Sequence, residues 1–155
     1  MMWGWRMTRF SAEVEHVLRS SGWEPGRRVD TTAWRRTLEA DGLVHMHEAA
    51  ERFLTEFGGL RVNLGGGGVS RAREPFELNP GDVESETDRF ADWGTHLGMN
   101  LFPIGELDRG RYFLGISEHA EIVLVETWVA SFGTGDAALE NLILGVAPEV
   151  IPEPS

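Results

Sequence analysis

Residues 46–64 carry the pattern that most restricts the fold of this chain. Six apolar residues recur there at intervals of three and four, the spacing of one face of an α-helix: Met46, Ala49, Ala50, Phe53, Leu54 and Phe57. Gly58-Gly59 follows at once, and glycine accepts the left-handed conformation in which helices commonly end. Residues 60–64 then alternate between apolar and polar, as in a strand with one buried face. The segment therefore predicts a helix that passes through two glycines directly into a strand.

Other helices are indicated by capping residues and by apolar periodicity. Ser11 can cap the first of them, and Ser20-Ser21-Gly22 ends it. A second helix is expected to begin at Asp30, Thr31 or Thr32 and to end at Asp41-Gly42. Further along the chain, helices are expected after Asn79-Pro80 and from Asp136 to Gly145.

Strands are expected between these helices. Gly65–Gly68 is interpreted as a hairpin loop, with residues 75–78 as the second arm. Later strands are expected at 99–104, ended by a turn at Gly105, at 112–116 and at 122–129. Short strands with polar turns predict an α+β fold: a single domain with a largely antiparallel central sheet and helices packed on it. We divide the chain into an N-terminal extension (1–9), the domain (10–147) and a proline-rich tail (148–155).

Negative charge is confined almost entirely to the second half of the chain. Residues 1–73 have a balance of +2, whereas residues 74–155 have a balance of −13, which gives the net charge of −11. An acidic surface repels nucleic acid and attracts a basic protein. No stretch of the chain is long and apolar enough to span a membrane, so neither nucleic acid nor a membrane is an expected partner. The alternative interpretation is solubility alone. Four acidic residues at expected strand ends and turns are the candidate partner-binding residues: Glu106, Asp108, Glu118 and Glu121.

Candidate catalytic and metal-binding motifs are incomplete. The chain has no cysteine, so thiolate metal sites are excluded. His45 and His47 would point about 200° apart on a helix, and we interpret them as histidines in water at a helix start. The glycine loop lacks the lysine of a phosphate-binding loop. The acids at 82, 84, 86 and 88 are spaced by two, which disperses them around a helix N-terminus. We therefore predict no catalytic residue, no metal and no cofactor.

The chain contains 6 tryptophans, a large number for 155 residues. Trp23, Trp34, Trp93 and Trp128 lie in or beside expected elements, and core packing is the default interpretation of each. A tryptophan that proved exposed would be a candidate binding residue.

The N-terminus offers neither a membrane span nor a signal peptide. We therefore expect a cytoplasmic protein. The run Met7-Thr8-Arg9-Phe10 leads straight into a helix start, and we interpret Met7 as the start of the protein, with residues 1–6 as an appendage.

Several of these segments together resemble a known family. The segments are Phe10-Ser11-Ala12-Glu13-Val14, Gly22-Trp23-x-Pro25-Gly26-Arg27-x-Val29-Asp30, Trp34, His47-Glu48-Ala49-Ala50, Phe53-Leu54-x-Glu56-Phe57-Gly58-Gly59-Leu60, Pro75-Phe76, Gly98-x-x-Leu101-Phe102-Pro103-Ile104-Gly105-Glu106 and Ala138-Leu139. In this order they resemble the SUKH-3 group of bacterial immunity proteins, within the superfamily that includes the fungal Smi1/Knr4 proteins. The resemblance runs from about Phe10 to Gly145.

The resemblance implies an α+β fold and a non-enzymatic immunity protein that binds and neutralises a cognate polymorphic toxin domain, often a nuclease. It brings no catalytic residues with it. Two other functions are compatible with the residues: a scaffold or regulatory adaptor that binds an endogenous protein, and a small carboxylate-dependent hydrolase. The hydrolase requires an acidic pair with perturbed pKa values in a concave pocket.

Overall fold

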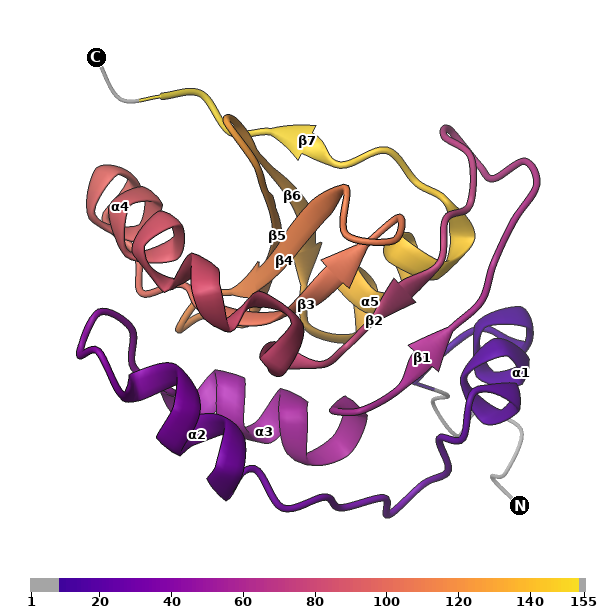
Figure 1. Ribbon diagram of the computed structural model, residues 1–155. Coiled ribbons are helices and arrows are strands. Elements are labelled where there is room, and N and C mark those ends of the chain that lie inside the picture. Colours follow the sequence, from indigo (N-terminus) through magenta and orange to yellow (C-terminus); the bar gives the residue numbers. More distant parts are fainter. Residues whose placement is uncertain (1–8, 154–155) are drawn as a thin grey trace, which may run out of the picture.

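A computed structural model describes residues 9–153 of the chain. It is a single α+β domain around one antiparallel sheet whose seven strands lie in the order of the sequence (Figure 1). The strands are β1 (Arg61–Val62), β2 (Phe76–Glu77), β3 (Phe102–Leu107), β4 (Tyr112–Ile116), β5 (Glu121–Val125), β6 (Val129–Thr134) and β7 (Glu149–Val150). The predicted fold class is therefore confirmed.

Five α-helices and a 3-10 helix, η2, surround this sheet in the described part of the chain. They are α1 (Ala12–Ser20), α2 (Thr32–Glu39), α3 (Glu48–Phe57), η2 (Pro80–Glu86), α4 (Thr87–Leu97) and α5 (Gly135–Leu144). In Figure 1, α2 and α3 lie below the sheet, α4 lies at its left, and α5 lies behind it, against β5 and β6.

The two glycines after α3 have different tasks. Gly58 has an extended backbone, and a Cβ there would stand 2.6 Å from the ring of Trp34. Gly59 has a φ of 86°, the left-handed conformation that glycine favours. Its N–H donates to the Leu78 carbonyl at 2.7 Å. The predicted passage from helix to strand is confirmed, and its first glycine is needed for space while its second is needed for conformation.

The sequence placed some element boundaries wrongly. Strand β3 continues through Gly105, where its register with β4 shifts, because the strand accommodates the glycine as an irregularity without turning. The expected strand 122–129 is two strands, β5 and β6, joined by a turn in which the Glu126 N–H donates to the Trp128 carbonyl at 2.8 Å. The apolar residues on both sides of Glu126-Thr127 concealed this turn.

Two helix starts also differ from expectation. The helix after Asn79-Pro80 begins as η2, and non-helical dihedral angles at Val83 separate it from α4. The last helix has Thr134 as its N-cap, and Asp136 binds Arg9 instead, with 2.9 Å between Nε and Oδ2. The Arg9 guanidinium also pairs with Glu56 at 2.7 Å. Arg9 therefore ties the chain before α1 to both α3 and α5.

The described part of the proline-rich tail, residues 148–153, contributes the exposed edge strand β7 to the sheet. Ala130 and Ser131 of β6 are its register partners, and the Ile151 N–H donates to the Val129 carbonyl at 2.9 Å. At the other end, Phe10 is buried in the core. The interpretation of Met7 as the start lies outside the described residues.

The four tryptophans placed in or beside elements divide into packed and exposed side chains. Trp23 is buried and stacks against Phe57, whereas Trp34 and Trp93 are half-buried against the core. Trp128 is 39% exposed in the β5–β6 turn, and its ring meets that of Tyr112 edge to face. Trp128 is thus the exposed tryptophan of the described chain that qualifies as a candidate binding residue.

Candidate partner-binding surface

The acidic half of the chain supplies five carboxylates on η2 and α4. This acidic belt consists of Asp82, Glu84, Glu86, Asp88 and Asp92. All but Glu86 are exposed. Arg89 is the basic residue within the belt, and its guanidinium pairs with Glu86 at 3.1 Å. The belt therefore presents a surplus of negative charge to solvent.

One end of the belt meets the sheet. Glu77 of β2 and Glu106 of β3 are register partners, and Asp82 of η2 joins them, so that one carboxylate oxygen of each lies within 4.8 Å of the other two. Reduced contact with water, a hydrogen bond with Glu77 and the charges of Glu106 and Glu77 raise the pKa of Asp82 to about 6. Burial and the charge of Glu77 also raise the pKa of Glu106. The arrangement can share a proton or accept a cationic group.

This carboxylate cluster corrects part of the sequence analysis. The spacing of two was expected to leave Asp82 dispersed in water at a helix N-terminus, but it meets acids from two strands. No local signal could have shown this, because the pairing of β2 with β3 is set by the long-range topology. Arg61 on β1 compensates part of the charge through Glu77, with 2.9 Å between Nε and Oε1.

The four predicted partner-binding residues lie at the two ends of β4. Glu106 belongs to the carboxylate cluster, and Asp108 follows it in the β3–β4 turn with a left-handed φ of 56°. Glu118 and Glu121 lie beyond the other end of β4. Glu118 is exposed, and the other three are partly buried. The structure thus brings them together as two pairs.

A backbone hydrogen bond anchors Glu118. Its Oε1 accepts the Asn100 N–H at 3.0 Å. Partial burial opposes ionisation of Glu118, but this hydrogen bond and the neighbouring His119 and His47 outweigh it and lower the pKa of the carboxyl group.

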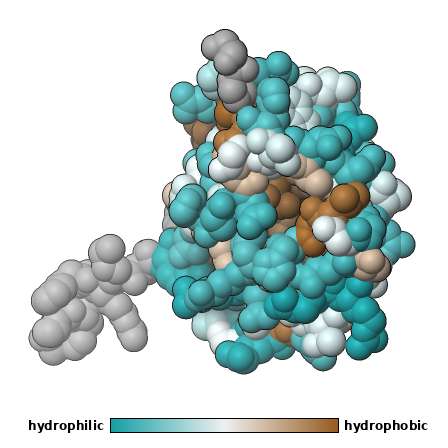
Figure 2. Space-filling view, turned by 90° about the vertical axis from the view of Figure 1, so that its left-hand side faces the viewer, coloured by the Kyte–Doolittle hydropathy of each residue, from teal (hydrophilic) through white to brown (hydrophobic). Residues whose placement is uncertain are grey.

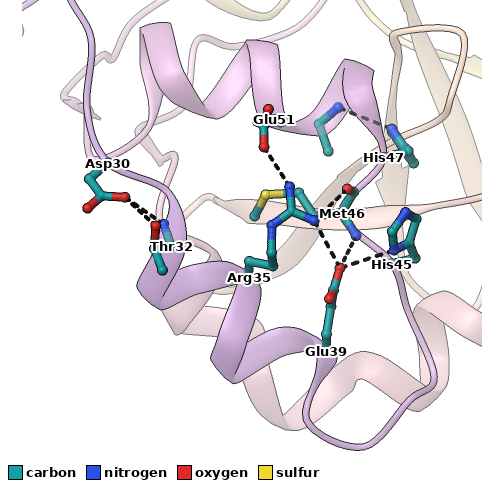
Figure 3. Close-up of polar contacts among 9 residues, drawn as sticks. Asp30, Thr32, Arg35, Glu39, His45, Met46, His47 and Glu51 are labelled. Carbon is teal, nitrogen blue, oxygen red and sulfur yellow. Dashed lines mark hydrogen bonds and ion pairs between the residues drawn. The ribbon is translucent and has the colours of Figure 1, made fainter.

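The two histidines before α3 occupy different environments. His45 is exposed and lies 3.2 Å from Glu39, which also accepts the Met46 N–H (Figure 3). His47 is half-buried, which corrects its interpretation as a histidine in water. Its Nδ1 accepts the Ala50 N–H at 3.1 Å and so caps α3. The two rings have separate partners.

The proton of His47 is consequently fixed on Nε2. That atom lies 3.0 Å from the Asn100 carbonyl and 3.1 Å from the Ile116 carbonyl, so it must donate to them. Burial lowers the pKa of His47 below its ordinary 6.5, because the neutral ring suits the site. His47 therefore links α3 to the start of β3 and the end of β4.

A cleft of about 570 Å³ lies between α3, the β4–β5 turn and the start of α5, and it is the place to look for hydrolase chemistry. It contains His119 and four carboxylates, but each carboxylate is engaged. Glu56 and Asp136 pair with Arg9, and Glu48 pairs with Arg52 at 2.9 Å. Glu118 accepts the Asn100 N–H. Carboxylates held in ion pairs and hydrogen bonds are weak general bases, so the cleft favours a structural interpretation over a hydrolytic one.

No helix within residues 9–153 is long and apolar enough to cross a membrane.

Comparison with known proteins identifies the family. The family model described as SUKH-3 immunity protein matches residues 10–145, nearly the same stretch over which the sequence resembles that group. No curated protein and no solved structure matches the chain. The family supports a role in toxin immunity and implies a cognate toxin as the partner. Because the match extends over most of its length, this chain belongs to the SUKH-3 immunity protein family.

Proposed function

We propose that this protein neutralises a cognate toxin by binding the toxin's catalytic domain, without catalysis of its own. The observation that carries the proposal is the acidic belt, which joins the carboxylate cluster at one end and continues along α4 at the other. A surface of this kind attracts a basic partner and raises its association rate by roughly 10–10³-fold at low salt. Family membership supplies the toxin as that partner.

A nuclease is the toxin class that fits this surface best. An enzyme that binds DNA or RNA presents cationic side chains to the phosphates of its substrate. The same side chains would face the carboxylates of the immunity protein, which would then cover the substrate-binding surface. Inhibition by occlusion follows from this charge complementarity and needs no contact with the catalytic residues of the toxin.

The two pairs of predicted residues can belong to one interface. Strand β4 has 5 residues, so the pair Glu106 and Asp108 lies about 17 Å from the pair Glu118 and Glu121. A standard protein interface covers about 800 Å² on each partner, which is wide enough to include both pairs. We propose that both pairs contact the toxin.

Co-expression with the toxin encoded by the neighbouring gene tests this function. Cells that carry both genes should survive, whereas cells that carry the toxin alone should die. Purified proteins should associate more slowly as ionic strength rises, while their dissociation rate changes little. Toxicity that persists in the presence of this protein refutes the immunity role, and an association rate insensitive to salt refutes steering alone.

Charge-neutralising variants test the two pairs. Glu106→Gln/Asp108→Asn and Glu118→Gln/Glu121→Gln should each weaken toxin binding about tenfold. Glu24→Gln/Glu51→Gln is the matched control, because it changes net charge equally at exposed positions outside the acidic half. A pair whose neutralisation weakens binding no more than this control does not contact the toxin.

A further inference from the structure

A groove runs along one side of α4 and shares Asp88 and Asp92 with the acidic belt. This groove of about 500 Å³ separates α4 from the β5–β6 turn and the C-terminal segment. Its lining, which defines the α4 groove, is Asp88, Arg89, Asp92, Trp93, His96, Glu126, Thr127 and Glu153. Figure 2 looks onto the side of the molecule that carries α4, and hydrophilic residues dominate that side around a small hydrophobic hollow.

The negative charge of the α4 groove is not compensated within the groove. Arg89 is its one arginine, and its Nη1 is already bound to Glu126 at 2.9 Å. Asp88, Asp92 and Glu153 form no ion pair with any residue of the range 9–153. Within the described part of the chain, three carboxylates therefore face solvent around one cavity without a counter-ion.

Two other cavities do not present a surplus of unpaired carboxylates. The cleft beside α3 has its carboxylates engaged, as described above. A further cavity of about 500 Å³ is lined by four arginines and two glutamates, so it is basic. Among these three cavities, charge favours the α4 groove as the one suited to a cationic group.

An aromatic side chain gives the groove a second recognition element. The Trp93 indole N–H donates to the Glu126 carbonyl at 3.0 Å, so its hydrogen-bonding capacity is met and its orientation is fixed. The ring is half-buried and contributes its remaining surface to the groove. Trp128, the exposed tryptophan, follows Thr127 in the turn that forms one wall. An indole next to carboxylates suits a guanidinium or ammonium group, which binds both the aromatic ring and the anions.

We propose that the α4 groove receives an arginine-rich segment of the toxin, with a cationic side chain against Trp93 and with Asp88, Asp92 and Glu153 as counter-ions. This inference rests on the proposed function and adds the site and the chemistry of the partner segment. It gives the toxin a contact outside the two pairs at the ends of β4. Arginine suits the site because its planar guanidinium stacks on aromatic rings while it hydrogen-bonds to carboxylates.

The first test uses an acetylated and amidated hexa-arginine peptide and needs no toxin. In NMR titrations, the indole N–H signal of Trp93, which lines the groove, should shift, while those of Trp23 and Trp34 stay in place. The variant Asp92→Asn/Glu153→Gln should bind the peptide about tenfold more weakly. The control Glu24→Gln/Glu51→Gln has the same net charge and should change the affinity less than about twofold. Equal losses in the two variants, or shifts at Trp23 and Trp34 instead, overturn the proposal.

The second test separates the groove from the immunity role. Asp92→Asn/Glu153→Gln should weaken binding of the neighbouring toxin about tenfold, with the control close to the original protein. If the original protein protects cells and this variant binds the toxin equally well, the groove is refuted while the immunity role stands. If the original protein gives no protection, both the immunity role and the groove as a toxin-binding site are refuted. Unfolding temperatures within about 2 °C of the original would confirm that both variants are folded, because exposed substitutions of this kind change stability little.

Discussion

Replacement of His47 should cost far more stability than replacement of His45, two residues away. The alanine variant of His47 removes the N-cap of α3, which contributes about 1 kcal/mol. It also removes the shared hydrogen bond from Nε2 to two backbone carbonyls, which contributes about 1–2 kcal/mol once the unpaired carbonyls are included. The expected loss is therefore about 2–3 kcal/mol. In a domain of this size it lowers the unfolding temperature by about 4–12 °C.

An asparagine at position 47 separates the two contributions. Asparagine is a good N-cap residue, but its shorter side chain cannot also reach the carbonyls of Asn100 and Ile116. His47→Asn should therefore recover about 1 kcal/mol relative to His47→Ala. His45→Ala is the matched control, because 66% of that side chain is exposed, and it should cost less than about 0.5 kcal/mol. Urea unfolding followed by circular dichroism at pH 7.5 measures all three variants.

The pH dependence checks the protonation state. The folded protein holds His47 with a lowered pKa, so the unfolded chain binds its proton first as the pH falls. The contribution of His47 to stability is complete above about pH 6.5 and is lost as the pH falls toward the folded pKa. His47→Asn should remove this component from the stability profile. A His47→Ala variant whose stability lies within about 0.5 kcal/mol of that of His45→Ala would refute the assignment of His47 as a structural link.

Three further substitutions probe other features. Asp82→Asn should stabilise the protein above pH 6 and leave its stability unchanged near pH 4 in thermal melts, because the raised pKa of Asp82 makes its ionisation unfavourable to folding. The exposure of Asp82 limits the gain to less than about 1 kcal/mol. Equal gains at both pH values would contradict the link between ionisation of Asp82 and stability. Gly58→Ala should destabilise the protein by about 1–3 kcal/mol, because the added methyl group would collide with Trp34, and the NMR signal of the Trp34 indole should shift. An unchanged unfolding temperature would show that the Trp34 ring has room for the methyl group. Arg9→Met should cost about 1 kcal/mol in urea unfolding at low salt and less at 1 M salt; a loss independent of salt would indicate packing instead of charge.

Local chemistry was enough to predict the features that depend on neighbouring residues. Ser11 caps α1 by accepting the Val14 N–H, and Gly145 ends α5 with a left-handed φ, as their residue types indicate. The strand at 112–116 has the expected limits because a turn bounds each end. Each of these depends on contacts a few residues apart in the sequence, which is where residue propensities are informative.

The candidate surface depended on contacts that span the fold. Glu77, Asp82 and Glu106 meet only because β2 pairs with β3 and η2 crosses next to them. His47 was assigned to water because its partners lie more than 50 residues away, at Asn100 and Ile116. The α4 groove requires the β5–β6 turn, which the continuous apolar run concealed. Charge composition indicated the kind of partner, whereas topology alone could place the carboxylates that would meet it.

The two outermost strands are short, which restricts how this protein can bind a partner. β1 and β7 each pair over two residues, and Pro148 and Pro152 lie on either side of β7. Each edge of the sheet offers few free main-chain donors and acceptors to a peptide. Addition of a strand from a partner is therefore disfavoured, and so is association of sheets into fibres. Recognition therefore depends on surface side chains, which can be replaced without disturbing the fold. The specificity for a new toxin can then change through surface substitutions alone.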